Sequence, residues 1–584
     1  MKVRDMKLQI FTLFVLMALV SGCGKRDGIY KLDIYATNDV HGKYFDSLYS
    51  DNKANPASLA NVSAYMKRVR AEKGRDNLLF GDIGDLLQGD NAAYYANFVD
   101  TTASAGKHLA VRVAESIGYD FMVVGNHDIE TGHPVYDRVK RELSIPYLAA
   151  NAIDKKSGKA YFQEYAIFRR GGLKVAVIGL TNANIKSWLD ERLWSGLEFA
   201  ELSDLSATLV KRVKERENPD ITILAVHAGV GNENADVYEI ENPAKYLASH
   251  TEGVDLVLAS HDHQVYIGKV YNGADSVLLV DGGSRAGYLS HINVSVEYRD
   301  GKIVSKNLTG ESIPMAQVEK DEAYIARFKE DFNNVKAFSN RTVGVLPKEI
   351  YTRDAYFGPS DYMSLIHSIQ LLASGAELSF AAPLTQNGYI KAGEFDYQDL
   401  FTIYPFENQL FVVKLTGEQI KNYLEKSYDN WIGTMKSRGD HIMKIRYNDS
   451  YGRYSFANFP FNFDSAGNLD YEVDVTEPFG SRIRIKGLSS GEEFSSAKSY
   501  TVALSSYRAS GGGDLLVSGA GIPAEELSSI VVEKMDDIRS LIYTLYKNGK
   551  GDEIKELENW KFVPESLAAD ALKRDKALLF GADR

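Results

Sequence analysis

The chain has 584 residues, and its 67 lysine and arginine residues against 79 aspartate and glutamate residues give a net charge of −12. Because binding along a nucleic-acid polymer requires a basic surface, no such polymer is expected as a partner. Hydrophobic residues make up 44% of the chain, as in a globular protein with a large core. The single cysteine excludes an internal disulfide framework and a zinc site built from cysteines.

The N-terminus has the pattern of an export signal. Three basic residues, Lys2, Arg4 and Lys7, precede a mostly apolar run at residues 8–20. This run is shorter than the about 20 residues that span a bilayer, but it suits a signal peptide. It ends in Val-Ser-Gly-Cys, which resembles the bacterial lipobox, where the signal peptide is removed before a lipid-modified cysteine.

We therefore predict a signal peptide at residues 1–22 and lipid attachment at Cys23. The protein is then expected in the bacterial cell envelope, anchored to a membrane at the periplasmic face or at the cell surface. The alternative is a buried first helix with an incidental cysteine.

Residues 23–312 are predicted to form an α/β domain of layered strands and helices. Short apolar runs bounded by Gly, Asp or Asn alternate there with amphipathic stretches, which indicates buried strands and covering helices. The runs lie at residues 32–36, 78–80, 121–124, 175–180, 221–226, 254–258 and 277–280.

Three further segments follow. A charged stretch predicts a linker helix within residues 313–342, and residues 343–550 combine helical and strand-like runs as a second domain. Residues 551–584 are predicted to be a charged helical tail.

Five short motifs contain side chains that can bind metal ions. Each follows the end of a predicted strand: Asp39-x-His41, Gly84-Asp85-x₃-Gly89, Gly125-Asn126-His127-Asp128, His227-x-Gly229 and His261-x-His263. The carboxyl ends of strands in an open α/β sheet lie along one edge, so these side chains are expected to converge.

The residue types favour a pair of divalent cations. Carboxylate, imidazole and amide oxygen without thiolate suit Mn, Fe, Zn or Co rather than a structural zinc ion. Two ions about 3.5–4 Å apart need a bridging ligand, and Asp85 is the candidate. Any one motif alone is more often a structural histidine or a turn, and Asp82 in Gly81-Asp82 competes with Asp85.

The ordered set resembles the calcineurin-like metallophosphoesterases. With the second region, the chain is similar to the branch of bacterial 5′-nucleotidases and 2′,3′-cyclic-nucleotide 2′-phosphodiesterase/3′-nucleotidases. The resemblance implies an N-terminal four-layer αββα domain and a C-terminal α/β substrate domain of the 5′-nucleotidase type. It also implies two ion sites: Asp39, His41, Asp85 and His263 for one ion, and Asp85, Asn126, His227 and His261 for the other.

The same resemblance assigns His127 to catalysis rather than to metal binding. It would stabilise the transition state and protonate the leaving oxygen. The family's aspartate partner of this histidine is replaced by Glu130, so either Glu130 or Asp128 is expected to hold the imidazole. A water or hydroxide activated by the two ions would be the nucleophile.

Two aromatic motifs in the second region resemble the family's base-binding pair. Tyr404-Pro405-Phe406 places Phe406 on one side of the base, and Tyr507 would take the other side, with Asp514 as a polar contact. Stacking of this kind is worth about 1–3 kcal/mol per base.

The segment at residues 381–388 lacks the anion-binding arginine of strict 5′-nucleotidases, which favours the cyclic phosphodiesterase/3′-nucleotidase branch. The predicted substrate is accordingly a 2′,3′-cyclic nucleotide or a nucleoside monophosphate. A strict 5′-nucleotidase or UDP-sugar hydrolase, an esterase of an inorganic sulfur compound, and a non-catalytic surface binding lipoprotein are the alternatives. No obligate protein partner is inferred.

Overall fold

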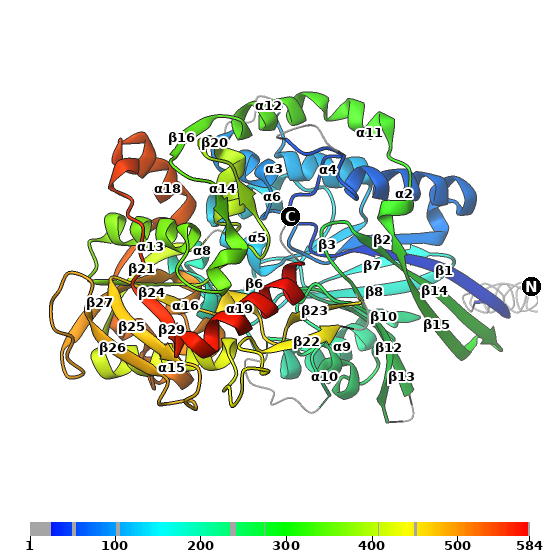
Figure 1. Ribbon diagram of the computed structural model, residues 1–584. Helices are drawn as coiled ribbons and strands as arrows, with labels where there is room; N and C mark the ends of the chain where they lie inside the picture. Colours follow the sequence, from blue (N-terminus) through cyan, green and yellow to red (C-terminus); the bar gives the residue numbers. More distant parts are fainter. Residues whose placement is uncertain are drawn as a thin grey trace, which may run out of the picture.

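The structure is a computed structural model that describes residues 25–49, 54–100, 106–233, 241–273, 275–406, 408–448 and 452–581. The predicted signal peptide and Cys23 lie outside the described residues. The chain forms two α/β domains, at the right and left of Figure 1, which confirms the predicted fold class. Within the described ranges, no helix is both long enough and apolar enough to cross a bilayer.

Two stacked six-stranded sheets form the centre of the first domain. One has the order β15 (Lys302–Pro314), β14 (Tyr288–Arg299), β1 (Gly28–Thr37), β2 (Leu78–Asp82), β3 (Phe121–Val123) and β4 (Tyr147–Leu148). The other has the order β12 (Val265–Asn272), β13 (Asp275–Gly282), β11 (Leu256–Ala259), β10 (Ile221–Val226), β8 (Leu173–Leu180) and β7 (Tyr165–Arg170).

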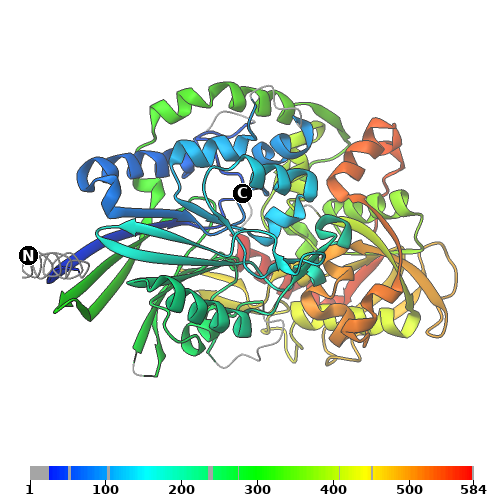
Figure 2. The same ribbon diagram turned by 180° about the vertical axis from the view of Figure 1, so that it is seen from behind.

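Helices cover the outer face of each sheet and complete four layers (Figures 1 and 2). The first sheet is covered by α2 (Leu59–Lys73), α4 (Leu109–Ile117) and α6 (His133–Glu142), and the second by α9 (Leu202–Glu217) and α10 (Ala244–His250). Every residue of β10 is buried. Ile221, Ile223 and Ala225 pack between the sheets, whereas Leu224 and Val226 pack under the helices, as the two-residue period of a strand requires.

Two helices, rather than the single predicted one, connect the domains. They are α11 (Glu322–Arg327) and α12 (Lys329–Ser339), and Phe328, with a φ of −103° and a ψ of 14°, separates them. Phe328 and Val335 pack into the first domain's core, so the connector forms part of that domain's helical layer.

The second domain is built on a five-stranded sheet with the order β24 (Ser465–Gly467), β18 (Leu378–Ala381), β27 (Ser499–Ser505), β21 (Gln409–Thr416) and β28 (Val531–Asp537). Helix α15 (Gly417–Trp431) packs on one face, and α13 (Asp361–Ser374), α14 (Tyr397–Ile403) and α18 (Ile538–Lys547) pack on the other.

The segment predicted as a helical tail contains a strand as well as a helix. β29 (Trp560–Val563) pairs with β25 (Leu469–Asp474), which also pairs with β26 (Ile483–Leu488), and α19 (Glu565–Phe580) follows. Trp560, Phe562 and Ala571 are buried in the second domain's core. The tail therefore completes that domain, because apolar side chains at alternating positions of β29 need the core to cover them.

Direct contacts join the two domains. Nδ2 of Asn91 donates to Oε1 of Gln398 over 2.8 Å, and Nζ of Lys534 in β28 lies 2.7 Å from Oδ2 of Asp190. The Asp190 side chain is fully buried, so this ion pair is shielded from solvent on the carboxylate side.

Candidate metal centre

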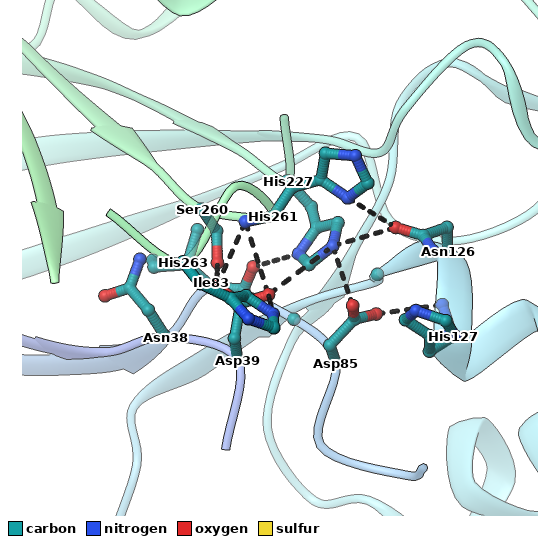
Figure 3. Close-up of polar contacts among 12 residues, drawn as sticks. Asn38, Asp39, Ile83, Asp85, Asn126, His127, His227, Ser260, His261 and His263 are labelled. Carbon is teal, nitrogen blue, oxygen red and sulfur yellow. Dashed lines mark hydrogen bonds and ion pairs between the residues drawn. The ribbon is translucent and has the colours of Figure 1, made fainter. Parts of the chain in front are cut away.

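Loops from both sheets of the first domain meet at the carboxyl ends of their strands. β1, β2 and β3 are parallel neighbours in one sheet, as are β10 and β11 in the other. Parallel strands present their carboxyl ends at one edge, where the following side chains converge. Figure 3 shows the resulting cluster, which includes Asp39, Asp85, Asn126, His127, His227, His261 and His263.

The possible metal ligands form two groups, each with ligand atoms within 4.8 Å of one another. One contains Asp39, His41 and His263, and the other contains Asp85, His227 and His261. Oδ2 of Asp85 lies 3.1 Å from Nε2 of His227 and 4.0 Å from Nε2 of His41, one residue from each group. Asp85 is therefore placed where a carboxylate could bridge two ions.

Asn126 lies at the second group. Its Oδ1 is 3.1 Å from Nε2 of His227 and 2.9 Å from Nδ1 of His261. An amide oxygen between two imidazoles is a fourth candidate ligand for that group.

Backbone carbonyls determine which nitrogen of two buried histidines is available. Nδ1 of His227 donates to the carbonyl of Ile83 over 2.7 Å, and Nδ1 of His41 donates to the carbonyl of Gln88 over 3.1 Å. With its proton on Nδ1, each neutral imidazole presents the lone pair of Nε2 to the centre. Nε2 of His41 lies only 3.0 Å from Nε2 of His263, a contact that favours a shared cation or proton.

The backbone at the centre is strained. Asp39, His41, Asp85, His261 and His263 all have positive φ, between 45° and 85°. Non-glycine residues in this region cost roughly 1–3 kcal/mol each. Glycine would adopt these angles without that cost. The presence of other residues at these positions therefore indicates that their side chains are needed.

Two residues that the sequence did not indicate hold His261. Its Nε2 lies 3.1 Å from Oε1 of Glu241, and its ring stacks on Trp188 with centroids 5.3 Å apart and planes 10° apart. A carboxylate on the second ring nitrogen fixes the orientation of a metal-binding histidine. Trp188 ends the short helix α7 (Ile185–Trp188) and Glu241 lies in a loop, both without a metal motif, so only tertiary contact identifies them.

The electrostatics also favour bound cations. Burial alone would raise the pKa of Asp85, but His227 and His127 together hold it well below its usual range. Burial alone would lower the pKa of His227, but the Asp85 carboxylate raises it to about 9. Burial lowers the pKa of His41 well below 6.5. Two buried carboxylates among imidazoles that can each present a nitrogen lone pair once deprotonated are a donor set that fits two divalent ions.

Glu130, rather than Asp128, contacts the predicted catalytic histidine. Helix α5 (Asn126–Glu130) places Nδ1 of His127 2.5 Å from Oε2 of Glu130. Asp128 is fully buried and accepts from the backbone N–H groups of Gly125 (2.8 Å), Leu87 (2.9 Å) and Asp85 (3.2 Å). Asp128 thus supports the loops that carry Asp85 and Asn126.

Asp82, the alternative to Asp85, does not face the centre. It is fully buried and accepts from Oγ1 of Thr37 (2.6 Å) and the backbone N–H of Gly84 (3.1 Å). Burial raises the pKa of this carboxyl well above its usual value. A protonated, hydrogen-bonded acid is a poor metal ligand.

The predicted substrate residues have different surroundings. Phe406 is 37% exposed, and Tyr507 lies edge-on to Phe461 with ring centroids 6.3 Å apart. Asp514 accepts from the backbone N–H of Ser518 (3.3 Å) and so caps a short helical segment. Burial raises the pKa of Tyr507; the charge of Arg508 opposes this shift, and the charge of Glu241 adds to it.

Arg508 fixes the loop that follows Tyr507. Its buried guanidinium contacts both carboxylate oxygens of Asp464 (2.7 and 3.1 Å) and donates to the carbonyls of Phe461 (2.9 Å) and Gly512 (2.5 Å). A Cβ at Gly512 would lie 2.5 Å from the Tyr507 ring, so the glycine permits direct backbone packing. In the sequence, the arginine shortly before the glycines at residues 511–513 is the feature that could have indicated this support.

Two family descriptions match the chain. Residues 32–265 match the calcineurin-like phosphoesterases, and residues 339–518 match the C-terminal domain of 5′-nucleotidases.

Relatives with curated names are distant in sequence. The chain is 24% identical to the trifunctional nucleotide phosphoesterase protein YfkN of Bacillus subtilis over 92% of this chain but only 39% of that protein. It is 23% identical to the 2′,3′-cyclic-nucleotide 2′-phosphodiesterase/3′-nucleotidase of Salmonella typhimurium, covering 82% of this chain and 81% of the relative. It is 25% identical to the 5′-nucleotidase of Vibrio parahaemolyticus, covering 79% of this chain and 90% of the relative.

Solved structures share the fold along most of the chain. A candidate 5′-nucleotidase from Staphylococcus aureus, in complex with alpha-ketoglutarate, has a TM-score of 0.74 at 20% identity and covers 91% of this chain and 99% of its own. A 5′-nucleotidase precursor from Thermus thermophilus has a TM-score of 0.62 at 18% identity, covering 92% and 100%. Both show the two-domain fold.

Proposed function

The chain joins a calcineurin-like phosphoesterase domain to a 5′-nucleotidase C-terminal domain, and we propose that it hydrolyses phosphate esters of nucleotides with two divalent ions. The proposed substrates are 2′,3′-cyclic nucleotides and nucleoside monophosphates, and the final products are nucleoside and phosphate. The observation that carries the proposal is the cluster around Asp85. His127 lies beside this cluster, and Glu130 contacts Nδ1 of His127.

The ions would be held by Asp39, His41, Asp85 and His263 on one side and by Asp85, Asn126, His227 and His261 on the other. When bound, such a pair supplies a nucleophile from water near neutral pH and stabilises charge on phosphoryl oxygens. Side chains of the protein are proposed to donate the proton and to bind the substrate.

His127 is the proposed proton donor. Glu130 accepts from Nδ1, so the carboxylate favours the protonated imidazole and turns Nε2 away from Glu130. A proton on Nε2 can pass to the leaving oxygen. The backbone N–H of His127 donates to Oδ1 of Asp85 over 2.9 Å, which ties this histidine to the proposed bridging carboxylate.

Substrate choice is proposed to depend on the second domain. Phe406 and Tyr507 are the proposed faces for the base, since every base offers a π surface to an aromatic ring. A strict 5′-nucleotidase is the second candidate, because relatives with that name match this chain at about the same identity, 25% against 23%, as a cyclic phosphodiesterase.

We propose that the protein acts outside the cytoplasm, anchored by a lipid on Cys23. The basic start, the apolar run and the Val-Ser-Gly-Cys sequence support this location. Replacement of the cysteine (Cys23→Ala) is expected to move the protein out of the membrane fraction. An unchanged distribution would contradict the lipid anchor.

Phosphate release from UMP, 3′-AMP, 2′,3′-cyclic AMP and UDP-glucose tests the activity. The Mn²⁺-loaded protein is expected to release phosphate from 3′-AMP and, with a second phosphatase step, from the cyclic nucleotide. Preference for UMP and UDP-glucose would favour the second candidate. Inactivity of the loaded protein on all four compounds would refute nucleotide hydrolysis.

A further inference from the structure

The turn between β13 and β14 is bound to two ligand-bearing loops of the metal centre. The backbone N–H of Arg285 donates to the carbonyl of Asp39 over 2.8 Å. The backbone N–H of Gly283 donates to the carbonyl of Gln264, next to His263, also over 2.8 Å. The position of Arg285 is therefore determined by the first group of candidate ligands.

The backbone of this turn is strained at two consecutive residues. Arg285 has a φ of 56° and Ala286 a φ of 54°. Glycine would adopt either angle without steric cost. The neighbouring Gly283 and Gly287 show that glycine is used in the same turn, so the arginine side chain at position 285 needs another explanation.

Arg285 brings a positive charge to a turn that is hydrogen-bonded to the loops of Asp39 and His263. Arg285 is exposed, whereas Ala286 is buried. No carboxylate among the described residues forms an ion pair with it.

We propose that Arg285 binds a phosphate oxygen of the substrate beside the first metal group and thereby determines affinity for phosphate esters. A guanidinium offers two parallel N–H donors that match two phosphate oxygens. This inference rests on the proposed phosphoesterase function. The segment at residues 381–388 contains no arginine and so offers no guanidinium to the substrate. The proposal places a cationic contact for the substrate in the first domain instead.

Replacements of Arg285 separate the charge from the backbone. Asparagine tolerates the left-handed region, keeps the backbone N–H and removes the charge. For Arg285→Asn we expect a roughly 10- to 100-fold rise in KM and in the inhibition constant of inorganic phosphate, with a smaller change in kcat. Arg285→Lys keeps a positive charge and is expected to recover part of the loss.

Thermal unfolding distinguishes a substrate contact of the Arg285 side chain from a purely structural role of this residue. Arg285→Gly relieves the strain, so it is expected to raise Tm while it raises KM. Asp300, at the exposed β14–β15 turn, also has a positive φ of 51°, and Asp300→Gly should raise Tm with KM unchanged. Arg169→Asn, at another exposed arginine, controls for the loss of a surface charge.

The measurements use the Mn²⁺-loaded protein, with metal content and calorimetric binding of inorganic phosphate determined for each variant. An unchanged KM and unchanged phosphate affinity in Arg285→Asn would overturn the proposal and leave the hydrolase function intact. A drop in metal content in that variant would overturn it too, because Arg285 would then act through Asp39. If the wild type hydrolyses no ester, the proposed phosphoesterase function is refuted. Binding of inorganic phosphate that is lost in Arg285→Asn would still support the contact between Arg285 and phosphate.

Discussion

Glu130 and Asp128 are two residues apart in α5, but they have different structural roles. Glu130 contacts the imidazole of His127 over 2.5 Å, whereas Asp128 accepts from three backbone N–H groups. We expect Glu130→Gln to lower kcat by roughly 10- to 100-fold with Tm unchanged, because the protonated imidazole loses its carboxylate. Steady-state kinetics and thermal unfolding check both parts.

Asp128→Asn is the matched variant, since both changes replace a carboxylate with an amide. Three buried N–H donors would face an amide with one oxygen, which costs about 1–3 kcal/mol for each donor left unpaired. We expect a lower Tm and a reduced metal content. If Asp128→Asn lowered kcat without affecting Tm or metal content, the assignment of the two acids would be reversed.

Proton competition at His227 determines how metal affinity changes with pH. Asp85 raises the pKa of His227 to about 9, so the metal-free centre holds this proton near neutral pH. A metal ion must displace it, and therefore the affinity falls as the pH drops below about 9. Calorimetry in buffers of different ionisation enthalpy should show proton release on Mn²⁺ binding. Affinity independent of pH between about 6 and 9 would contradict this linkage.

At the scale of the elements, α19 has a structural role in the second domain. Asp575 of α19 is fully buried, accepts from the backbone N–H groups of Ile442 (2.8 Å) and Met443 (2.9 Å), and lies 2.5 Å from Nδ1 of His441. We expect Asp575→Ala to lower the free energy of unfolding by about 2 kcal/mol or more, because these donors lose their acceptor. Asp570→Ala, on the exposed face of the same helix, should have little effect on denaturant unfolding. Equal stability of the two variants would refute the role.

Local sequence pattern identifies the candidate ligands of the metal centre, but it does not identify the residues that support them. Asp39, His41, Asp85 and the other candidate ligands follow buried strands, and strand ends meet at a sheet edge, so pattern alone places them together. Trp188 lies in a four-residue helix, and Glu241 and Arg285 lie in loops. The positions of these segments depend on tertiary packing, so local pattern does not reveal the three residues. The strand β29 was predicted as helix for the same reason, since its pairing partner, β25, lies far away in the chain.

At the scale of the whole molecule, the two domains divide the chemistry. Every candidate metal ligand comes from the first domain, whereas Phe406 and Tyr507 come from the second. The ion pair between Lys534 and Asp190 connects β28 to the loop that follows Trp188, which stacks on His261. A short series of contacts therefore links β28 of the second domain to His261 of the candidate metal centre.

This division predicts that a defect in the base site is specific to nucleotides. Stacking on one aromatic ring is worth about 1–3 kcal/mol, so Tyr507→Ala should raise KM for 3′-AMP by roughly tenfold or more. p-Nitrophenyl phosphate has no base, and its kinetics in this variant should match those of the wild type. Phe479→Ala, at a side chain of the same domain that is 54% exposed, provides the control. Equal losses on both substrates would mean that Tyr507 supports the metal centre rather than the base.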